Sequence, residues 1–305
     1  PAGFEGLRVG IDTNHMVCAK EQGRNSYQFY TEGMQEREVM RLQLDKDLSQ
    51  ALANNELSLY YQPQLNLETG AIDSVEALIR WHHPRRGLVP PAEFIPLAEE
   101  SGRIRDIGRW VIQAACNQLA QWRGTPCEHL RIAINLSGRE LENEDLVDDL
   151  RQSLLNAGIA PNRLEVELTE ESYIRNIEHN HNQLARIHDL GIHLAIDDFG
   201  VGYSSLGYLR DFPVDVLKID RSFITDVPQR HESGIITRAV ISLAHNLGIR
   251  VIAEGVETEE QLAFLKRYRC HLAQGYLISR PMPAAELERA LAAGLLVTGP
   301  EDGGL

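Results

Sequence analysis

Short apolar runs alternate with longer amphipathic stretches along most of the chain. The runs are rich in β-branched and aromatic residues and are bounded by turn residues, a pattern typical of strands. They are LSLYYQPQL (57–65), SVEALIRW (74–81), RIAINLS (131–137), LEVELTE (164–170), IHLAIDDF (192–199), VLKID (216–220), RVIAEG (250–255) and LAQGYLIS (272–279). Segments with helical spacing are predicted at about 105–123, 144–157, 175–190, 231–247, 258–268 and 284–293.

The connections between these runs predict the topology. The first two runs are joined by the short turn LETG (67–70), which indicates an antiparallel hairpin. The later strands alternate with helices, and such repeats give parallel strands with right-handed crossovers. We therefore predict an α/β fold, a TIM-like (β/α)₈ barrel whose first strand is antiparallel. An open doubly wound sheet is the competing architecture, but no G-x-G-x-x-G follows a first strand.

The sequence before the barrel predicts a separate helix. Leu44, Leu48 and Leu52 recur every four residues, so we interpret residues 34–53 as a linker helix. Residues 54–295 are expected to form the barrel, and residues 296–305 a flexible C-terminal tail. The first residues have no clear periodicity and include a His15-Met16 pair that resembles a cloning junction.

Composition narrows the partners and the compartment. The chain has 305 residues and a formal net charge of −14 at pH 7, which argues against a nucleic-acid polymer as partner. Every apolar run falls short of the roughly 18 residues that a membrane helix needs, so we expect no membrane contact by this piece. The four cysteines form no C-x-x-C pair, and we expect a cytoplasmic location. A membrane anchor in domains outside this sequence is compatible with that expectation.

Each predicted strand carries one polar residue that a buried strand should avoid. These residues are Gln62, Glu76, Asn135, Glu167, Asp197, Lys218, Glu254 and Gln274. Period-two alternation turns such residues inward and their apolar neighbours outward, toward the helices. In a barrel of this kind the functional groups lie at the carboxyl ends of the strands. The same alternation turns Glu165 inward beneath Glu167, for which the sequence offers no reason.

Two adjacent acids end the fifth run. Asp197 and Asp198 would point to opposite faces of a regular strand, so both reach the barrel mouth only if the strand ends there, as Gly200 and Gly202 indicate. Converging carboxylates require a cation, and oxygen ligands with one amide favour Mg²⁺ or Mn²⁺ over zinc. One bridging and one flanking aspartate suit two metal ions about 4 Å apart. A solvated turn is the alternative reading of this pair.

Several motifs occur together in a recognisable order. They are EALIRW (76–81), NLS (135–137), ELTE (167–170), DDFGVGYSSL (197–206), KIDRSFI (218–224), AEGVE (253–257) and QGYLISRPMP (274–283). Over roughly residues 45–295 the chain resembles the EAL-domain phosphodiesterases, which hydrolyse cyclic di-GMP. The resemblance implies a TIM-like barrel with an antiparallel first strand, two divalent cations (Mg²⁺ or Mn²⁺), and a homodimer formed through the barrel.

The resemblance also implies a role for each matching residue. The implied metal ligands are Glu76, Asn135, Glu167, Asp197, Asp198 and Glu254. Asp197 would bridge the two ions. Lys218 would contact the nucleophilic water and Glu254 would act as the general base, so that the implied catalytic set is Glu254, Lys218 and Glu76. The implied substrate-binding residues are Gln62, Arg80, Gln274 and Leu78.

Two further glutamates, Glu170 and Glu257, are implied to stabilise the loop 199–208, which contributes to dimerisation in the family. Val201 stands in that loop where the family more often has threonine, so it is expected to affect coupling but not metal binding. Upstream, AKEQGRNSYQFY (19–30) resembles the end of a GGDEF domain. Residues 1–33 are thus interpreted as partly vector-derived, followed by the tail of such a domain.

The expected function is metal-dependent hydrolysis of cyclic di-GMP to linear pGpG in bacterial second-messenger signalling. The main alternative is a module that binds cyclic di-GMP without cutting it. A protein-interaction scaffold and a different metal-dependent barrel hydrolase are the other candidates. Every motif residue whose loss would favour a pure receptor is present, which favours the enzyme.

Overall fold

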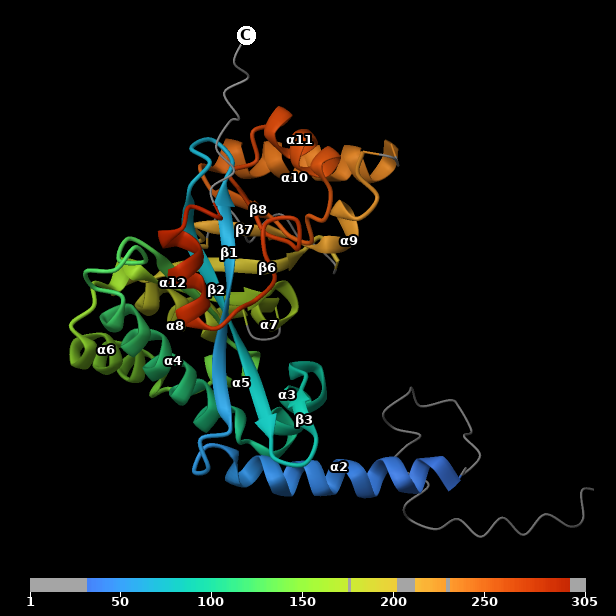
Figure 1. Ribbon diagram of the computed structural model, residues 1–305, viewed down its shortest axis with the longest axis vertical. Helices are drawn as coiled ribbons and strands as arrows, with labels where there is room; N and C mark the ends of the chain where they lie inside the picture. Colours follow the sequence, from blue (N-terminus) through green and yellow to red (C-terminus); the bar gives the residue numbers. More distant parts are fainter. Residues whose placement is uncertain (1–31, 175–176, 202–211, 229–230, 297–305) are drawn as a thin grey trace, which may run out of the picture. The chain divides into compact units, whose positions relative to one another are not determined.

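The structure, a computed structural model, describes residues 32–174, 177–201, 212–228 and 231–296 (Figure 1). The chain divides into two compact units, residues 1–48 and 49–305. The helix predicted over 34–53 is present as α2 (Glu32–Ala51), which contains the described part of the first unit. The segment that resembles the end of a GGDEF domain, and the chain after Leu296, lie outside the described residues.

The second unit is built on a closed ring of strands. The ring consists of β1 (Leu57–Asn66), β2 (Ile72–His83), β4 (Arg131–Asn135), β5 (Leu164–Thr169), β6 (His193–Phe199), β7 (Val216–Ile219), β8 (Arg250–Ala253) and β9 (Leu272–Ala273). β1 pairs antiparallel with both β2 and β9, and all the other neighbours in the ring are parallel. The predicted TIM-like barrel with an antiparallel first strand is confirmed. A short strand, β3 (Gly87–Val89), pairs with the end of β2 outside the ring.

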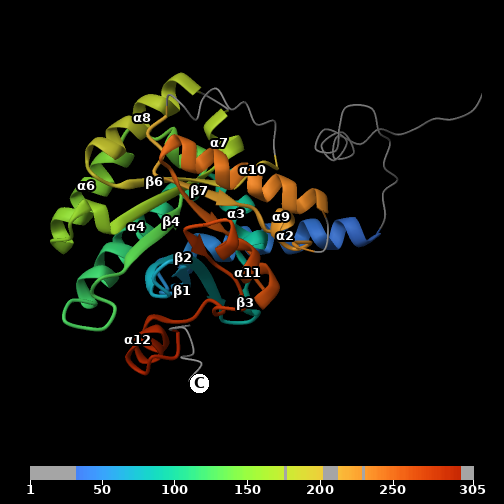
Figure 2. The same ribbon diagram turned by 90° about the horizontal axis from the view of Figure 1, so that it is seen from above.

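Helices surround the ring, as the view in Figure 2 shows for α4, α6, α8 and α10. The predicted helices are present within a few residues as α4 (Ile104–Gln121), α6 (Leu146–Ala157), α8 (Ile177–Asp189), α10 (His231–Leu247), α11 (Glu259–Arg267) and α12 (Ala284–Ala292). The helices without a prediction are α3 (Pro91–Ser101), α5 (Gly138–Leu141), α7 (Glu170–Ile174) and α9 (Arg221–Ile224). Pro96 lies inside α3 and breaks the sequence pattern there, whereas Pro91 at its first position is compatible with a helix. Among the described residues, none of the helices combines the length and apolarity of a membrane span.

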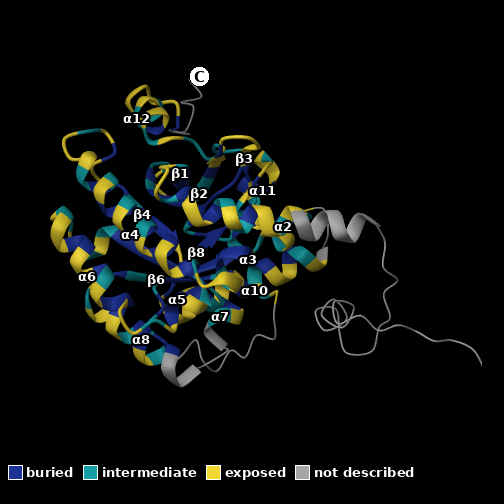
Figure 3. Cartoon of the chain, turned by 90° about the horizontal axis from the view of Figure 1, so that it is seen from below, coloured by how far each residue is buried: buried dark blue, intermediate teal, exposed yellow. Residues whose placement is uncertain are grey.

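The strands form the buried centre of the second unit, and the helices expose their outer faces (Figure 3). Lys218 contacts carboxylates from other strands, which places its side chain inside the ring. Its neighbours Leu217 and Ile219, on the opposite face of β7, are buried toward the helices. The predicted alternation of polar-in and apolar-out therefore holds on this strand.

The last strand is shorter than its sequence predicts. The apolar run 272–279 continues past β9, but the strand ends at Ala273 and the chain turns, with Ile278 N–H and Ser279 N–H both donating to Gly275 O. Gly275 is packed so closely that a Cβ atom there would lie 2.1 Å from Val256 O. This backbone contact, which the apolar pattern does not encode, ends the strand and positions Gln274.

Candidate active site

Lys218 lies at the centre of a cluster of carboxylates inside the barrel. Its Nζ is 2.5 Å from Glu167 Oε2, 2.7 Å from Glu254 Oε1, 3.1 Å from Asp197 Oδ2 and 3.8 Å from Glu76 Oε2. The side chain is completely buried. Burial alone would lower the pKa of the ammonium group, but the surrounding carboxylates outweigh it and raise the pKa well above its ordinary value. Lys218 is therefore charged.

Glu76, on β2, is held by two amide side chains. Asn135 Nδ2 donates to Glu76 Oε1 at 2.7 Å, and Gln274 Nε2 donates to Glu76 Oε2 at 2.5 Å. The same amide of Gln274 donates to Gln62 Oε1 at 3.1 Å. Burial raises the pKa of Glu76, but Lys218 and these hydrogen bonds together bring it below its ordinary value. Four residues that were predicted from four different strands thus meet in one network.

Asp197 and Asp198 both reach the site, by a route that differs from the predicted one. The sequence predicts that the strand ends at the pair, whereas β6 continues to Phe199. Asp198 has a left-handed backbone (φ 54°), and the register of β6 against β7 shifts between Ile196 and Phe199. This irregularity turns the second aspartate toward the first. Gly200 follows with φ 96°, and Gly202 lies outside the described residues.

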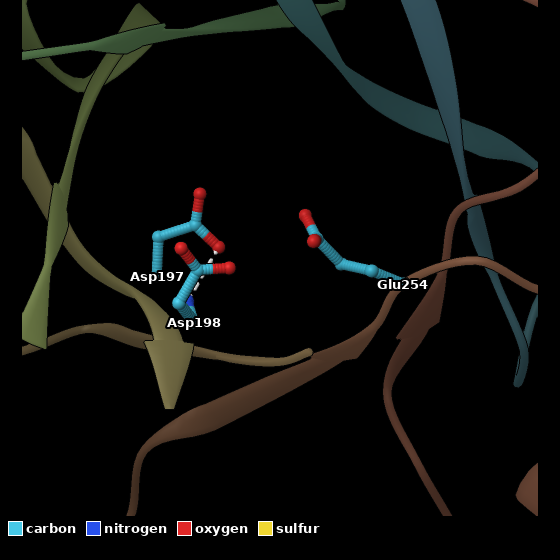
Figure 4. Close-up of side chains that lie close together, drawn as sticks. All are labelled: Asp197, Asp198 and Glu254. Atoms are coloured by element: carbon cyan, nitrogen blue, oxygen red, sulfur yellow. Dashed lines mark hydrogen bonds between the residues drawn. The ribbon is translucent and has the colours of Figure 1, made fainter. Parts of the chain in front are cut away.

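The two aspartates face Glu254 across the mouth of the barrel (Figure 4). Each of the three side chains offers a carboxylate oxygen, and these oxygens lie within 4.8 Å of one another. Asp198 N–H donates to Asp197 Oδ1 at 2.8 Å, which fixes the pair. Burial raises the pKa of Asp198, and the charges of Asp197 and Asp220 raise it further. Asp220, which was not predicted as a site residue, therefore belongs to this acidic cluster.

The other two glutamates also hold their protons more tightly than usual. Burial raises the pKa of Glu254 to about 8 in spite of the opposing charge of Lys218. Burial likewise raises the pKa of Glu167 well above its ordinary value, and the nearby carboxylates add to the effect of burial. Glu167 Oε1 is buried and has no hydrogen-bond partner in the described part of the chain. The site thus holds more carboxylate oxygen than one lysine satisfies.

This donor set fits a hard divalent cation. The carboxylates of Glu76, Glu167, Asp197, Asp198 and Glu254 lie beside the amide of Asn135, and the group of possible ligands found among the described residues contains no cysteine, which suits Mg²⁺ or Mn²⁺. The unpartnered oxygen of Glu167 and the close oxygens of the Asp197, Asp198 and Glu254 group are positions at which a cation would supply the missing charge.

A cavity of about 220 Å³ lies above the cluster. Its lining includes the predicted residues Gln62, Glu76, Leu78, Asp197, Glu254, Glu257 and Gln274. Besides Gly255 and Gly275, it includes two side chains that were not predicted, those of Arg221 and the half-exposed Tyr276. Both stand inside quoted motifs, three residues after Lys218 and two after Gln274, so their position beside predicted site residues is the signal that could have found them.

Arg80 takes a different position. It is absent from the lining of this cavity, its guanidinium carbon lies 5.6 Å from the centre of the Tyr60 ring, and its Nη1 donates to Ile79 O at 2.9 Å. Burial lowers its pKa, although the charge of Glu76 acts in the opposite direction. Its contact with a phosphate remains a prediction.

Glu170, the first residue of α7, contacts the start of the loop 199–208. Its buried carboxylate accepts the N–H of Gly200 at 3.3 Å. From Gly202 onward the loop 199–208 lies outside the described residues. The backbone N–H of Glu257 donates to Gln261 Oε1 at 2.7 Å, and its part in holding the loop remains a prediction.

The inward position of Glu165 has a structural explanation. The side chain is buried, with Oε2 3.0 Å from Arg131 Nη1 and 3.7 Å from Arg250 Nη2. Arg131 and Arg250 begin β4 and β8, so the amino-terminal end of the barrel contributes the charges that compensate this carboxylate.

Comparison with known proteins places this arrangement in a family. Residues 45–281 match the EAL domain family, and the chain belongs to it. It is 46% identical over 275 residues to the cyclic di-GMP phosphodiesterase NbdA of Pseudomonas aeruginosa, a match that covers 90% of this chain and 35% of NbdA. It is 40% identical over 274 residues to the cyclic di-GMP phosphodiesterase PdeR of Escherichia coli, covering 90% of this chain and 41% of PdeR.

Solved structures show the same fold. The phosphodiesterase MucR in complex with c-di-GMP superposes with a TM-score of 0.77 at 42% identity, over 80% of this chain and 99% of that one. MucR of Pseudomonas aeruginosa is named a bifunctional diguanylate cyclase and cyclic di-GMP phosphodiesterase. The chain spans only about a third to two fifths of the length of the curated relatives it matches.

Proposed function

We propose that this chain is a metal-dependent phosphodiesterase that hydrolyses cyclic di-GMP to linear pGpG in bacterial second-messenger signalling. The observation that carries the proposal is the group of Asp197, Asp198 and Glu254, whose oxygens lie within 4.8 Å of one another beside a buried lysine. The relatives NbdA and PdeR, named as cyclic di-GMP phosphodiesterases, support the choice of substrate.

Two divalent cations, Mg²⁺ or Mn²⁺, would be held by these side chains. Glu76, Asn135, Glu167 and Asp197 are assigned to one ion, and Asp197, Asp198 and Glu254 to the other. When bound, such ions lower the pKa of a water molecule and neutralise charge on phosphoryl oxygens.

Two residues of the chain would remove the proton of the attacking water. Glu254, whose Oε1 lies 2.7 Å from Lys218 Nζ and whose side chain lines the cavity, is assigned as the general base that takes a proton from the attacking water. Lys218, kept charged by its carboxylates, orients Glu254 at 2.7 Å. The water oxygen bonds to one phosphorus and the P–O3′ bond breaks. The 3′ oxygen takes up a proton from solvent water and leaves as a hydroxyl, and the phosphate stays on the 5′ end of pGpG.

Substrate binding is assigned to the lining of the cavity and to its surroundings. Gln62, Leu78 and Gln274 line the cavity and would contact the dinucleotide. Arg80, which lies against Tyr60 outside this lining, would contact a phosphate of the dinucleotide. We further propose a homodimer through the barrel, with Glu170 and Glu257 holding the loop 199–208 for that contact. Sedimentation analysis at several concentrations tests the dimer.

A chromatographic assay tests the activity. The chain is incubated with cyclic di-GMP and Mg²⁺ or Mn²⁺, with EDTA as one control and Glu76→Ala as the inactive variant. The exposed Glu68→Ala on the β1–β2 turn is the matched control. We expect pGpG only with metal and an intact Glu76. Saturable binding without product would favour a module that binds cyclic di-GMP without cutting it. If neither product nor binding is detected, the protein-interaction scaffold is the alternative that stays.

A further inference from the structure

Arg221 is a positively charged residue of the cavity that has no role in the mechanism described above. It is the first residue of α9, directly after the N-cap residue Asp220, whose carboxylate accepts the N–H of Ser222 at 3.0 Å. Its exposed side chain lines the cavity above the cluster, where the other charged side chains are acidic: Glu76, Asp197, Glu254 and Glu257. Within the described ranges, its guanidinium makes neither an ion pair nor a hydrogen bond.

The backbone of the site holds Arg221 in this position. Gly255 has φ 67°, and a Cβ atom there would lie 2.6 Å from Arg221 Cβ and 3.3 Å from its Cα. The absence of a side chain at residue 255 therefore allows the start of α9 to pack against the turn after β8. Gly255 directly follows Glu254, and Asp220, on the other side of Arg221, belongs to the acidic cluster around Asp198. The two residues that flank Arg221, Gly255 in space and Asp220 in sequence, thus connect it to the assigned metal ligands Glu254 and Asp198.

We propose that Arg221 binds the phosphate group that is cut, an inference that rests on the proposed phosphodiesterase function. Lys218 cannot take this role because it is completely buried and surrounded by carboxylates. Arg80 is outside the cavity lining. Of the described residues that line the cavity, Arg221 alone carries a positive charge, and a guanidinium binds two phosphoryl oxygens at once.

The charge of the phosphate group changes during the reaction, so the strength of its contact with Arg221 should change as well. Hydrolysis converts a phosphodiester with one negative charge into a terminal phosphate with up to two, so an arginine beside it is bound more strongly by the product than by the substrate. Charge also builds up on the phosphoryl oxygens during the reaction, which an arginine stabilises. Loss of Arg221 should therefore lower kcat/KM and weaken inhibition by pGpG. The inhibition constant of pGpG should change by a larger factor than KM.

The experiment compares the full chain with Arg221→Met, which keeps most of the apolar stem, and Arg221→Lys, which keeps the charge. The exposed Arg105→Met is the matched control. Two substrates are used with Mn²⁺: cyclic di-GMP and bis(p-nitrophenyl) phosphate, which has a phosphodiester but no guanine or second phosphate. We expect Arg221→Met to lose roughly 10- to 100-fold in kcat/KM on both substrates, with a smaller loss for Arg221→Lys. The inhibition constant of pGpG should rise by a larger factor than KM for cyclic di-GMP.

Gly255→Ala is the second variant, since its new Cβ displaces Arg221, and Gly234→Ala on α10 is its control because its Cβ has ordinary contacts at 3.6 Å. A merely structural Arg221 would lower the melting temperature without changing the ratio of pGpG inhibition to KM. Unchanged kinetics in Arg221→Met, or a loss confined to cyclic di-GMP, would overturn the assignment. If the wild type cuts neither substrate, the proposed function fails. In that case the affinity for pGpG with Mn²⁺ is measured by calorimetry. Weaker binding by Arg221→Met would support the contact with the phosphate, and equal affinity in wild type and Arg221→Met would overturn it.

Discussion

Lys218 Nζ lies 2.5 Å from Glu167 Oε2, and neither side chain has any exposed surface. The two residues come from β7 and β5, which are separated in the ring by β6, so the contact crosses the interior of the barrel. Asp197 from β6, Glu254 directly after β8 and Glu76 from β2 complete the group around the ammonium ion. Lys218 therefore compensates the charge of several strands at once.

Replacing Lys218 by methionine should destabilise the chain severely. It leaves buried carboxylates without their cation, and breaking a buried pair in this way costs about 3–5 kcal/mol. Urea unfolding in EDTA at pH 7 measures the loss, with the exposed Lys266→Met as control. Addition of Mn²⁺ should restore part of the stability. A Lys218→Met chain as stable as the wild type in EDTA would contradict the central role of this lysine.

Divalent cations should stabilise the folded chain through Asp198. A ligand that binds only the folded state adds about 2.7 kcal/mol at a hundred times its Kd, so the melting temperature of the wild type should rise with Mn²⁺. Asp198→Asn removes one of the three clustered carboxylates and should lose the part of this rise that comes from the ion assigned to Asp197, Asp198 and Glu254. The exposed Asp189→Asn on α8 is the control and should keep it. An equal Mn²⁺-dependent rise in Asp198→Asn would show that Asp198 holds no metal ion.

Gly275→Ala should damage both stability and activity. The new Cβ would lie 2.1 Å from Val256 O and 2.3 Å from Val256 N, and these backbone atoms have little freedom to move. Overpacking of this kind costs about 1–3 kcal/mol. Because Val256 N–H donates to Gln274 O at 3.0 Å, the displacement also reaches Gln274 at the site. Chemical unfolding and the cyclic di-GMP assay measure the two effects, and Gly234→Ala, whose Cβ has ordinary contacts at 3.6 Å inside α10, should lower neither.

Glu140 should make stability depend on pH in the neutral range. Its buried carboxyl on α5 accepts Ser137 N–H at 2.9 Å and Ser137 Oγ at 2.6 Å, and burial raises its pKa to about 7 from 4.5. A raised carboxyl pKa means that the folded state binds more protons than the unfolded state between these values. The contribution of Glu140 to the free energy of unfolding is thus fully present below pH 4.5. It is lost as the pH rises through about 7, and the total loss is about 3 kcal/mol.

The free energy of unfolding, measured in urea from pH 5 to 8, tests this dependence. Glu140→Gln removes the titrating group while keeping an acceptor for Ser137, so its profile should be flatter than that of the wild type. The exposed Glu142→Gln, two residues further along, should keep the wild-type slope. Parallel profiles for wild type and Glu140→Gln would show that Glu140 does not carry the effect.

The periodicity of the chain was sufficient to predict much of this protein. The alternation of strands and helices, the LETG turn and the polar residues placed within the apolar runs predict the barrel, its antiparallel first strand and the interior position of residues such as Glu167 and Lys218. These features are local, since side-chain direction in a strand follows from the period of two residues. The motif order predicts the family, which the comparison confirms.

Other features depend on contacts between residues far apart in the sequence. The left-handed backbone of Asp198, the early end of β9 at Ala273, and the two arginines that compensate Glu165 all follow from how neighbouring strands and loops meet. The same holds for Arg221, which reaches the cavity because Gly255 allows close packing. Local pattern thus determined which residues point inward, whereas the tertiary structure decided which charges compensate one another, because burial and electrostatic pairing depend on distances that sequence spacing does not contain.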